Sequence, residues 1–208
     1  MNKDIYDILD YYIPNPKCEL DYSNPFELLI ATILSAQCTD KRVNIVTKEL
    51  FKKYDINSLA NAAKEDVEDI IRSCGSYSKK SDYIITVSKR LLTDYDGIVP
   101  NNRKYLESLP GVGRKTTNVV IKNIYNEPSI PVDTHVERVS KRLGFARPND
   151  SVRTIEKKLM KKISKDKWNR VSEQILLFGR YYCTSKNPKC LDCKFKNYCK
   201  YRNNLHKF

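Results

Sequence analysis

The chain has 208 residues, and its 38 Lys and Arg residues against 25 Asp and Glu residues give a formal net charge of +13. This excess of positive charge favours a polyanionic partner such as nucleic acid, although a generally Lys-rich composition would also produce it. The longest apolar run, residues 26–34, contains Glu27 and is far shorter than the about 20 residues that cross a bilayer, which argues against a membrane protein. The first residues lack the basic start and the cleavage site of an export signal, so we expect a soluble, cytoplasmic protein.

The spacing of apolar residues predicts an all-α fold. Nearly every segment between turn signals has apolar residues three or four positions apart, and no sustained alternation indicates a strand. The first clear helix begins after Asn24, with Pro25 at its first position and Glu27 three residues after the cap, and it runs to about Leu34. Because this helix is apolar on nearly all sides, we expect it to be central in the fold.

Two later segments each predict a helix with one apolar face. The first is marked by Ile84, Val87 and Leu91. The second is marked, at steps of three and four, by Trp168, Val171, Ile175, Phe178 and Tyr182. We interpret both stripes as faces that pack against the protein core, not as binding sites for a cofactor.

The segment 109–117, with the sequence LPGVGRKTT, predicts a tight turn between a short helix near residues 105–108 and a second helix that passes through Ile124. Gly111 and Gly113 leave the backbone uncovered where the second helix begins. Its free N–H groups and the positive end of its dipole then form an anion site suited to a DNA phosphate, with Arg114 beside it. A plain interhelical turn is the alternative, and the basic flank and the net charge favour phosphate binding.

Lys115 falls in the first turn of that second helix. The positive helix end and the basic surroundings disfavour an ammonium group there, which raises the share of neutral amine, the form that attacks carbon. An exposed lysine that only binds phosphate is the alternative interpretation. Lys115 therefore becomes a candidate nucleophile only together with a carboxylate partner.

Asp133, eighteen residues further on, is the candidate partner. Thr134 and Glu137 have the spacing of a capping box, so a helix can begin at Thr134 and leave Asp133 free to face the site. Asp133 can also cap the helix itself, and both roles can hold together. The neighbouring His135 is more typical of a hydrogen-bonded structural residue than of a catalyst.

Four of the seven cysteines gather near the C-terminus with the spacing C-x6-C-x2-C-x5-C. They are Cys183, Cys190, Cys193 and Cys199. Clustered thiols in a chain without an export signal indicate metal binding in a reducing compartment, not a disulfide framework. Four sulfur ligands suit either a tetrahedral zinc ion or an iron–sulfur cubane, and the spacing does not decide between them.

These segments together resemble the helix-hairpin-helix DNA glycosylase superfamily, and specifically its endonuclease III branch. The resemblance extends over nearly the whole chain. It is carried by SNPFELLIATILSAQCTDKRVN, GIVPNNRKYLESLPGVGRKT, VDTHVERVSKRLGF and LLFGRYYC. It implies a bifunctional enzyme of base excision repair, which removes oxidised pyrimidines as a DNA glycosylase and then cleaves the abasic site as a lyase.

The resemblance assigns roles to particular residues. Lys115 would form a Schiff base with the sugar, leading to β-elimination, and Asp133 would stabilise the positive charge. The four C-terminal cysteines would hold a [4Fe-4S] cluster. By resemblance, Gln37 would fill the gap left by the extruded base. The positive charge on the cysteine loops adds Lys186 and Lys189 as DNA contacts, beside the hairpin contacts of Gly111, Gly113 and Arg114 inferred above.

The resemblance also implies two helical domains flanking a DNA-binding cleft. One would be a helical barrel, residues 18–127, with the helix-hairpin-helix motif, and the other a cluster domain, residues 1–17 plus 128–208. The partner would be double-stranded DNA containing damaged bases or abasic sites, bound by a monomer at the nucleoid of a prokaryotic cell. The family usually has a bulky apolar wedge after the glycine that matches Gly75, whereas this chain has Ser76 and then Tyr77, which leaves strand opening and opposite-base preference undetermined.

Three other functions remain compatible with parts of the sequence. A non-catalytic DNA-binding module could use the same hairpin but would not need Lys115 and Asp133 together. An adenine-removing mismatch glycosylase shares the cluster but typically lacks this lysine. A zinc-stabilised nucleic-acid protein without repair activity would be colourless and would bind zinc stoichiometrically.

Overall fold

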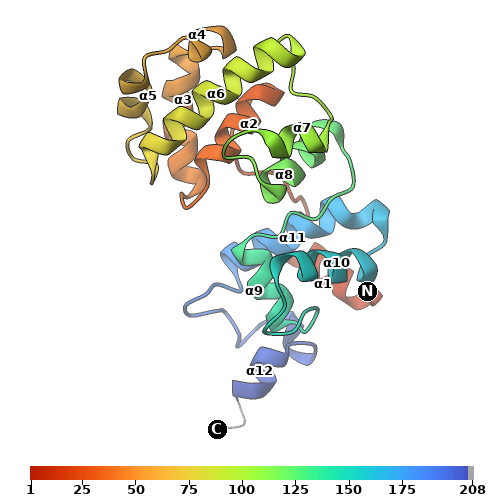
Figure 1. Ribbon diagram of the computed structural model, residues 1–208. Coiled ribbons are helices and arrows are strands. Elements are labelled where there is room, and N and C mark those ends of the chain that lie inside the picture. The colour runs from red at the N-terminus through yellow and green to blue at the C-terminus, as the bar shows by residue number, and fades with distance from the viewer. Residues whose placement is uncertain (206–208) are drawn as a thin grey trace. The chain divides into compact units, whose positions relative to one another are not determined.

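The computed structural model describes residues 1–205, and their regular secondary structure is helical throughout (Figure 1). This confirms the predicted all-α class. The chain divides into two compact units, one formed by Cys18–Tyr125 and the other by Met1–Lys17 together with the chain from Asn126 onwards. No helix within the described residues combines the length and the apolar character needed to span a membrane.

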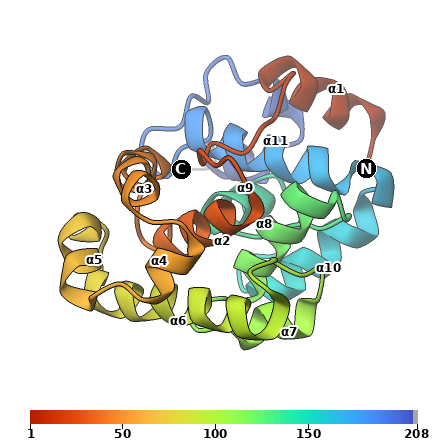
Figure 2. The same cartoon turned by 90° about the horizontal axis from the view of Figure 1, so that it is seen from above.

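The unit Cys18–Tyr125 is built around one buried helix. Its helices are α2 (Pro25–Leu34), α3 (Asp40–Lys53), α4 (Ile56–Ala60), α5 (Lys64–Ile71), α6 (Tyr77–Tyr95), α7 (Arg103–Ser108) and α8 (Arg114–Tyr125). Figure 2 shows α2 with α3, α6 and α8 packed against it. The side chain of Asn24 accepts a hydrogen bond from Glu27 N at 3.0 Å, and Pro25 is the first helical residue. Both the start of this helix and its central position agree with the prediction.

The core of this unit is apolar. Leu28, Leu29 and Leu34 of α2 are fully buried, as is Ile84 of α6 on the stripe that the sequence predicts. Burying such side chains stabilises the fold by roughly 1.5–3 kcal/mol each, so α2 fixes the positions of the helices that surround it.

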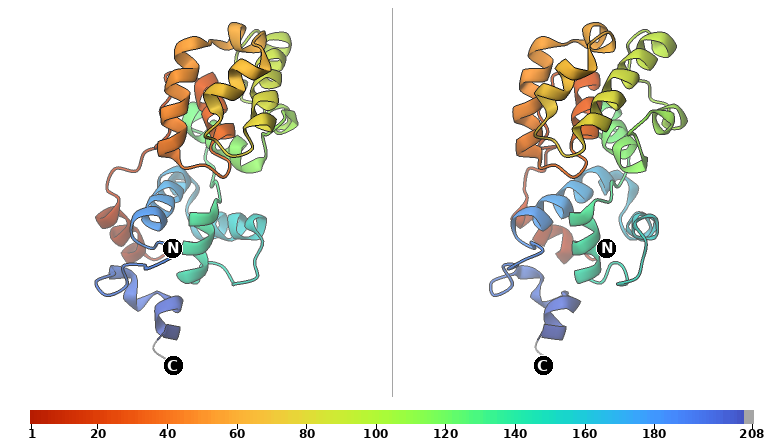
Figure 3. Two further views of the ribbon diagram at one scale, coloured as in Figure 1. Left: turned by 90° about the vertical axis from the view of Figure 1, so that its left-hand side faces the viewer. Right: turned by 60° about the vertical axis from the view of Figure 1, so that its left-hand side comes forward.

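The second unit combines the two chain ends. Its helices are α1 (Lys3–Tyr12), α9 (Thr134–Arg142), α10 (Val152–Lys162), the 3-10 turn η1 (Lys165–Lys167), α11 (Trp168–Tyr181), the 3-10 turn η2 (Lys194–Asn197) and α12 (Lys200–Leu205). Both views of Figure 3 show α9 beside α11. A Cβ atom on Gly179 of α11 would lie 2.9 Å from Val139 Cγ2 and 3.1 Å from His135 Cβ, so this glycine is what allows the two helices to approach closely. Of the predicted apolar stripe, Val171, Ile175 and Phe178 are buried along α11, while Trp168 at its start and Tyr182 at its C-cap are half-buried.

Candidate functional site

The turn between α7 and α8 uses its two exposed glycines differently. Gly111 has φ +75°, and a Cβ atom there would lie 2.6 Å from Tyr83 Cδ2, so both the backbone conformation and the packing require glycine. At Gly113 a Cβ atom would have no described heavy atom within 4 Å. Gly111 therefore shapes the turn, while Gly113 leaves open space beside the start of α8, where a phosphate group can approach the helix N-terminus.

One side of the hairpin packs against the protein core, and the other side is exposed to solvent. Val112 and Thr117 are buried, and Arg90 Nη1 donates to Ser108 O at 2.9 Å, which holds the end of α7. Lys115, in the first turn of α8, is exposed, and among residues 1–205 its ammonium group makes no hydrogen bond or ion pair. A rigid support thus carries a lysine that is available for chemistry.

Asp133 caps α9. Its Oδ1 accepts hydrogen bonds from His135 N at 2.9 Å and from Val136 N at 2.8 Å. The predicted capping box starting at Thr134 is therefore wrong, because Thr134 is the first residue of the helix and Asp133 takes the cap position. The half-buried carboxylate uses only Oδ1 for this role, so the cap fixes its orientation and leaves Oδ2 available. Lys115 and Asp133 belong to different units.

His135 has a structural setting. Arg138 Nη2 lies 3.2 Å from His135 Nδ1 and donates to Gly179 O at 2.7 Å, while Arg138 Nε donates to Cys183 O at 3.1 Å. Burial lowers the pKa of His135, although Asp133 acts in the opposite direction. The imidazole is therefore held neutral between two helices. Arg138, which the sequence analysis did not single out, connects the helix of Asp133 to the first cysteine of the C-terminal group.

The four C-terminal cysteines line one cavity. Its wall also includes the aromatic rings of Tyr12, Phe178 and Phe195. Arg142 Nη1 lies 3.3 Å from Cys183 Sγ, and Cys199 Sγ lies 3.6 Å from Arg142 O. Among residues 1–205, no three His, Cys, Asp or Glu side chains converge closely enough to ligate a single metal ion. The thiols thus surround a space instead of converging on one point.

Burial raises the pKa of the Cys183 and Cys193 thiols, while Arg142 counteracts this at Cys183. Thiolate ligands in such a setting need a positively charged centre beside them. Lys189 lines the same cavity with its ammonium group 5.2 Å from the Tyr182 ring centroid, and Lys186 is exposed on the loop between the first two cysteines. The sequence spacing therefore located a set of sulfur donors with basic side chains around it.

Gln37 lies in an exposed segment that follows α2. Its backbone is left-handed, with φ +55°, and Lys80 Nζ holds the preceding residues by donating to Leu34 O at 2.9 Å and Ala36 O at 2.7 Å. Burial lowers the pKa of Lys80. The sequence analysis missed this lysine, yet it lies four residues before Ile84 on the same apolar stripe of α6. A charged residue on a core stripe is the signal that could have found it.

Ser76 occupies the position where the resemblance noted above implies an apolar wedge. It is exposed, has φ +57°, and precedes α6 without a side-chain capping bond. The half-buried Tyr77 ring lies 5.5 Å from the guanidinium of Arg72. A Cβ atom on Gly75 would lie 3.9 Å from Gln37 O, so the segment of Ser76 lies beside that of Gln37.

Comparison with known proteins agrees with these features. Residues 30–165 match the family described as HhH-GPD superfamily base excision DNA repair protein. Endonuclease III of Bacillus subtilis (strain 168) is 47% identical over 188 residues, which cover 90% of this chain and 86% of the relative. Endonuclease III of Escherichia coli (strain K12) is 40% identical over 190 residues, covering 91% and 90%. The chain belongs to the endonuclease III family.

Solved structures of endonuclease III extend the comparison. A trapped endonuclease III–DNA covalent intermediate matches with a TM-score of 0.94 and 44% identity over 100% of both chains. A thermostable thymine-DNA glycosylase has a TM-score of 0.85 at 22% identity over 97% and 95% of the two chains, which shows a common fold. As a member of this family, the chain is a DNA-binding glycosylase and abasic-site lyase of base excision repair, as the sequence analysis predicts. A DNA-binding module without catalysis no longer fits.

Proposed function

We propose that this protein removes oxidised or ring-saturated pyrimidines from duplex DNA and cleaves the abasic site that results, with Lys115 as the nucleophile and Asp133 as its carboxylate partner. The observation that carries the proposal is the state of the lysine. It is exposed and unpaired among the described residues, at the start of a helix whose preceding turn has open space at Gly113. The cap bonds of Asp133 support its role, because they orient the carboxylate and leave one oxygen unused.

The hairpin would grip the DNA backbone without reading its sequence. Phosphate oxygens would accept hydrogen bonds from the N–H groups at the start of α8, while Gly111 and Gly113 keep side chains out of the way and Arg114 adds positive charge. An enzyme that acts on a base must first rotate it out of the stack, and Gln37 would fill the gap that this leaves.

The chemistry would proceed through a covalent intermediate on Lys115. The neutral amine attacks C1′, the bond from C1′ to the base breaks, and the base leaves with a proton. The C1′–O4′ bond then breaks, so that the sugar ring opens and O4′ takes up a proton while the nitrogen forms a Schiff base with C1′. A proton is lost from C2′, and the C3′–oxygen bond breaks by β-elimination, with the 3′ phosphate as the leaving group. Asp133 would stabilise the positive charge on the sugar and accept protons, an effect worth roughly 10²- to 10⁴-fold as a general base.

A [4Fe-4S] cluster would bind in the cavity lined by Cys183, Cys190, Cys193 and Cys199. The family resemblance supports this group over zinc, because four sulfur donors around one cavity suit either. When bound, the cluster would supply a covalent connection between chain segments. Lys186 and Lys189 would then present positive charge to DNA phosphates. A colourless purified protein with one zinc ion per chain would contradict this assignment.

Borohydride trapping tests the nucleophile. The wild type should form a covalent adduct with duplexes that contain an oxidised pyrimidine or an abasic site, whereas Lys115→Ala should bind the same DNA and form none. Lys104→Ala is the matched control, because this exposed lysine of α7 belongs to the same hairpin and its loss removes the same charge. A trapped adduct from Lys115→Ala would overturn the assignment.

Asp133→Asn tests the partner without disturbing the helix. Asn caps helices about as well as Asp, so stability and DNA affinity should remain unchanged while single-turnover adduct formation slows by roughly 10²-fold or more. Adduct formation at the wild-type rate would show that the carboxylate acts only as a cap.

The lesion range and the assembly state are parts of the same proposal. We expect the protein to sediment as a monomer. Because the relatives described above are bacterial, we also expect it to act in the cytoplasm at the nucleoid. Parallel assays with an oxidised pyrimidine and with an adenine mismatch should give base release only from the former, and adenine release would instead indicate the mismatch-specific function.

A further inference from the structure

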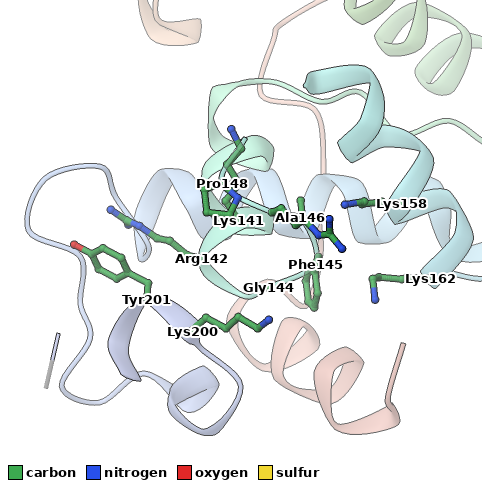
Figure 4. Close-up of a pocket in the computed structure, with 11 residues that line it drawn as sticks. Lys141, Arg142, Gly144, Phe145, Ala146, Pro148, Lys158, Lys162, Lys200 and Tyr201 are labelled. Atoms are coloured by element: carbon green, nitrogen blue, oxygen red, sulfur yellow. The ribbon is translucent and has the colours of Figure 1, made fainter. Parts of the chain in front are cut away.

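A second hollow lies in the unit that contains both chain ends. It is formed by the end of α9, the loop that follows it, one face of α10 and the start of α12 (Figure 4). Its volume of about 580 Å³ falls within the roughly 300–1,000 Å³ of small-molecule sites. Asp133 caps the opposite end of α9, so the hollow lies about one helix length, roughly 13 Å, from the candidate catalytic carboxylate.

The lining of this hollow is strongly basic. Figure 4 shows the side chains of Lys158 and Lys162 on one side of the hollow and that of Lys200 on another. No acidic side chain lines it among the described residues. The basic residues in the lining are Lys141, Arg142, Arg147, Lys158, Lys162 and Lys200.

Three of these six basic groups already have partners. Lys141 pairs with Glu137 at 2.6 Å and Lys158 pairs with Asp150 at 2.5 Å, both acids lying outside the lining. The guanidinium of Arg142 donates to main-chain carbonyls of the cysteine loop. The charges of these three groups are therefore satisfied by partners within the protein and need no ligand.

Among the side chains that the structure describes, those of residues 1–202, the charged groups of Arg147, Lys162 and Lys200 make no hydrogen bond or ion pair. The negative C-terminal end of α10 compensates Lys162, which lies in its last turn. The lysine partner of Asp150 and the nearby Arg147 both lower the pKa of that acid, so its carboxylate partly compensates Arg147. No such compensation is described for Lys200. A Cβ atom on Gly144 would lie 2.6 Å from Lys200 Cε, so this glycine makes room for the lysine stem across the loop. The lysine is thus held in place with its ammonium group unpaired.

We propose that this hollow binds linked phosphate groups, supplied either by a free oligophosphate such as a nucleoside triphosphate or by a stretch of DNA backbone beyond the repair site. Unpaired positive charges gathered in one hollow repel each other, and a ligand carrying several negative charges relieves that repulsion. Phosphate oxygens accept charge-assisted hydrogen bonds from both guanidinium and ammonium groups. The rings of Phe145 and Tyr201 add an apolar wall.

Calorimetric titration of the intact, cluster-loaded protein with tripolyphosphate tests the site. The double variant Arg147→Gln, Lys162→Gln should bind at least about tenfold more weakly than the wild type, because it loses two of the three unpaired charges. The double variant Arg153→Gln, Lys157→Gln is the matched control. It removes one Arg and one Lys, both exposed on α10 and outside the hollow, and should change the affinity less than about twofold.

A competition experiment identifies the source of the phosphates. Displacement of tripolyphosphate by an undamaged duplex, with weaker duplex binding by the Arg147→Gln, Lys162→Gln variant, assigns the hollow to DNA backbone. Simultaneous binding of duplex and tripolyphosphate assigns it to a free oligophosphate. Equal losses of tripolyphosphate affinity in the two double variants would overturn the proposal, as would the absence of saturable tripolyphosphate binding to the wild type. Thermal melting checks that both variants are folded.

A different observation concerns two cysteines outside the C-terminal group. Cys38 Sγ lies 3.8 Å from Cys74 Sγ, although the two residues are 36 positions apart. Cys74 is completely buried and Cys38 is half-buried. Cys38 follows α2, directly after Gln37, and Cys74 lies two residues before Ser76. The segment of Gln37, which the proposed function assigns to DNA, is therefore in contact with the segment of Ser76 through a pair of thiols.

We infer that Cys38 and Cys74 are a site of reversible oxidation to a disulfide. The thiolate of the more accessible Cys38 attacks a low-molecular-weight disulfide, forms a mixed disulfide and releases one small thiol. Cys74 then attacks the Cys38 sulfur and releases the second. The protein loses two protons and two electrons, and the small disulfide takes them up as two thiols. The pKa of Cys74, raised to about 11 by burial, fits its role as the second thiol to react.

Oxidised glutathione is the probe for this reaction, and peptide mass spectrometry is the readout. Wild-type, cluster-loaded protein should yield a cross-linked peptide joining residues 38 and 74, which a reductant removes. Cys38→Ser should yield none, whereas Cys18→Ser, which removes another half-buried cysteine, should still yield it. A persistent glutathione adduct on Cys38 without the cross-link, or no reaction at either residue, would overturn the inference. This outcome is independent of the proposed contact between Gln37 and DNA.

Discussion

The two units hold their candidate catalytic residues by different means. In the unit Cys18–Tyr125, the hairpin of Lys115 rests on an apolar core that is dominated by α2. In the other unit, the helix of Asp133 also packs into an apolar core through Val136 and Val139, and Arg138 adds polar bonds because it donates to Gly179 O and to Cys183 O. The candidate nucleophile therefore depends mainly on close packing, whereas the helix of the candidate carboxylate combines packing with polar bonds that lead to the cysteine loop.

The chain contains a natural probe for this difference. Its single tryptophan, Trp168, belongs to the second unit, where Nε1 donates to Ile163 O at 2.9 Å. Tryptophan fluorescence thus reports on that unit alone, while far-ultraviolet circular dichroism reports on the helices of both. Comparing the two signals in urea shows which unit a substitution affects.

The largest effect is expected from Leu29→Ala. This side chain is fully buried in α2, and its truncation should destabilise the unit Cys18–Tyr125 by about 2–5 kcal/mol. The dichroism midpoint should fall further than the fluorescence midpoint. Equal shifts in both signals would contradict the comparison, because they would mean that the two units unfold together.

Arg138→Met should act on the other unit. It keeps an apolar stem but leaves the carbonyls of Gly179 and Cys183 without their charged donor, at a cost of about 1.5–3 kcal/mol. The fluorescence midpoint should shift most, and iron content per chain should fall. Arg138→Lys, which keeps the charge, should lose less. Unchanged fluorescence in Arg138→Met would show that these bonds do not hold α9.

The two glycines of the hairpin should separate stability from DNA binding. Gly111→Ala must adopt a positive φ and displace the Tyr83 ring, which should destabilise the protein by about 1–2 kcal/mol. Gly113→Ala meets no described atom, so it should leave stability nearly unchanged while weakening duplex affinity in a filter-binding assay. If Gly113→Ala instead lowered stability and Gly111→Ala mainly weakened duplex binding, the placement of the phosphate contact at Gly113 would be wrong.

The smallest effect is a pH dependence from His135. Burial lowers the pKa of its imidazole in the folded state below the ordinary value of 6.5. Between those two pKa values the unfolded chain binds more protons, so stability falls as the pH decreases below 6.5. Urea denaturation followed by fluorescence should show this fall, and His135→Gln should reduce it. If His135→Gln and the wild type lost stability equally as the pH decreased, a group other than His135 would be responsible.

The sequence predicted those helix starts and turns that depend only on residues close together along the chain. The cap at Asn24 with Pro25 behind it defines the start of α2, and the glycines before Arg114 define the hairpin, because each signal lies within a few positions. The capping of α9 could not be decided in the same way. Asp133 and Thr134 are both good caps, and the choice depends on a backbone conformation that the surrounding packing sets.

Contacts between distant positions also lay beyond the sequence pattern. Arg138 reaches Cys183, 45 positions away, and Cys38 meets Cys74 although each appears isolated along the chain. Periodicity describes the face of one helix and gives no information on which other helix that face meets. The positions of these side chains therefore had to come from the structure.

The cap role of Asp133 and its proposed catalytic role together limit how this protein can change during evolution. A Glu at this position would keep the negative charge but would be a poor cap, so the helix would begin less firmly. Replacement by Asn has the opposite outcome, a well-formed helix without the charge. A cell that carries such an allele would make a stable protein that still occupies damaged DNA, so the mutation is expected to be dominant, with inactive copies shielding lesions from active ones.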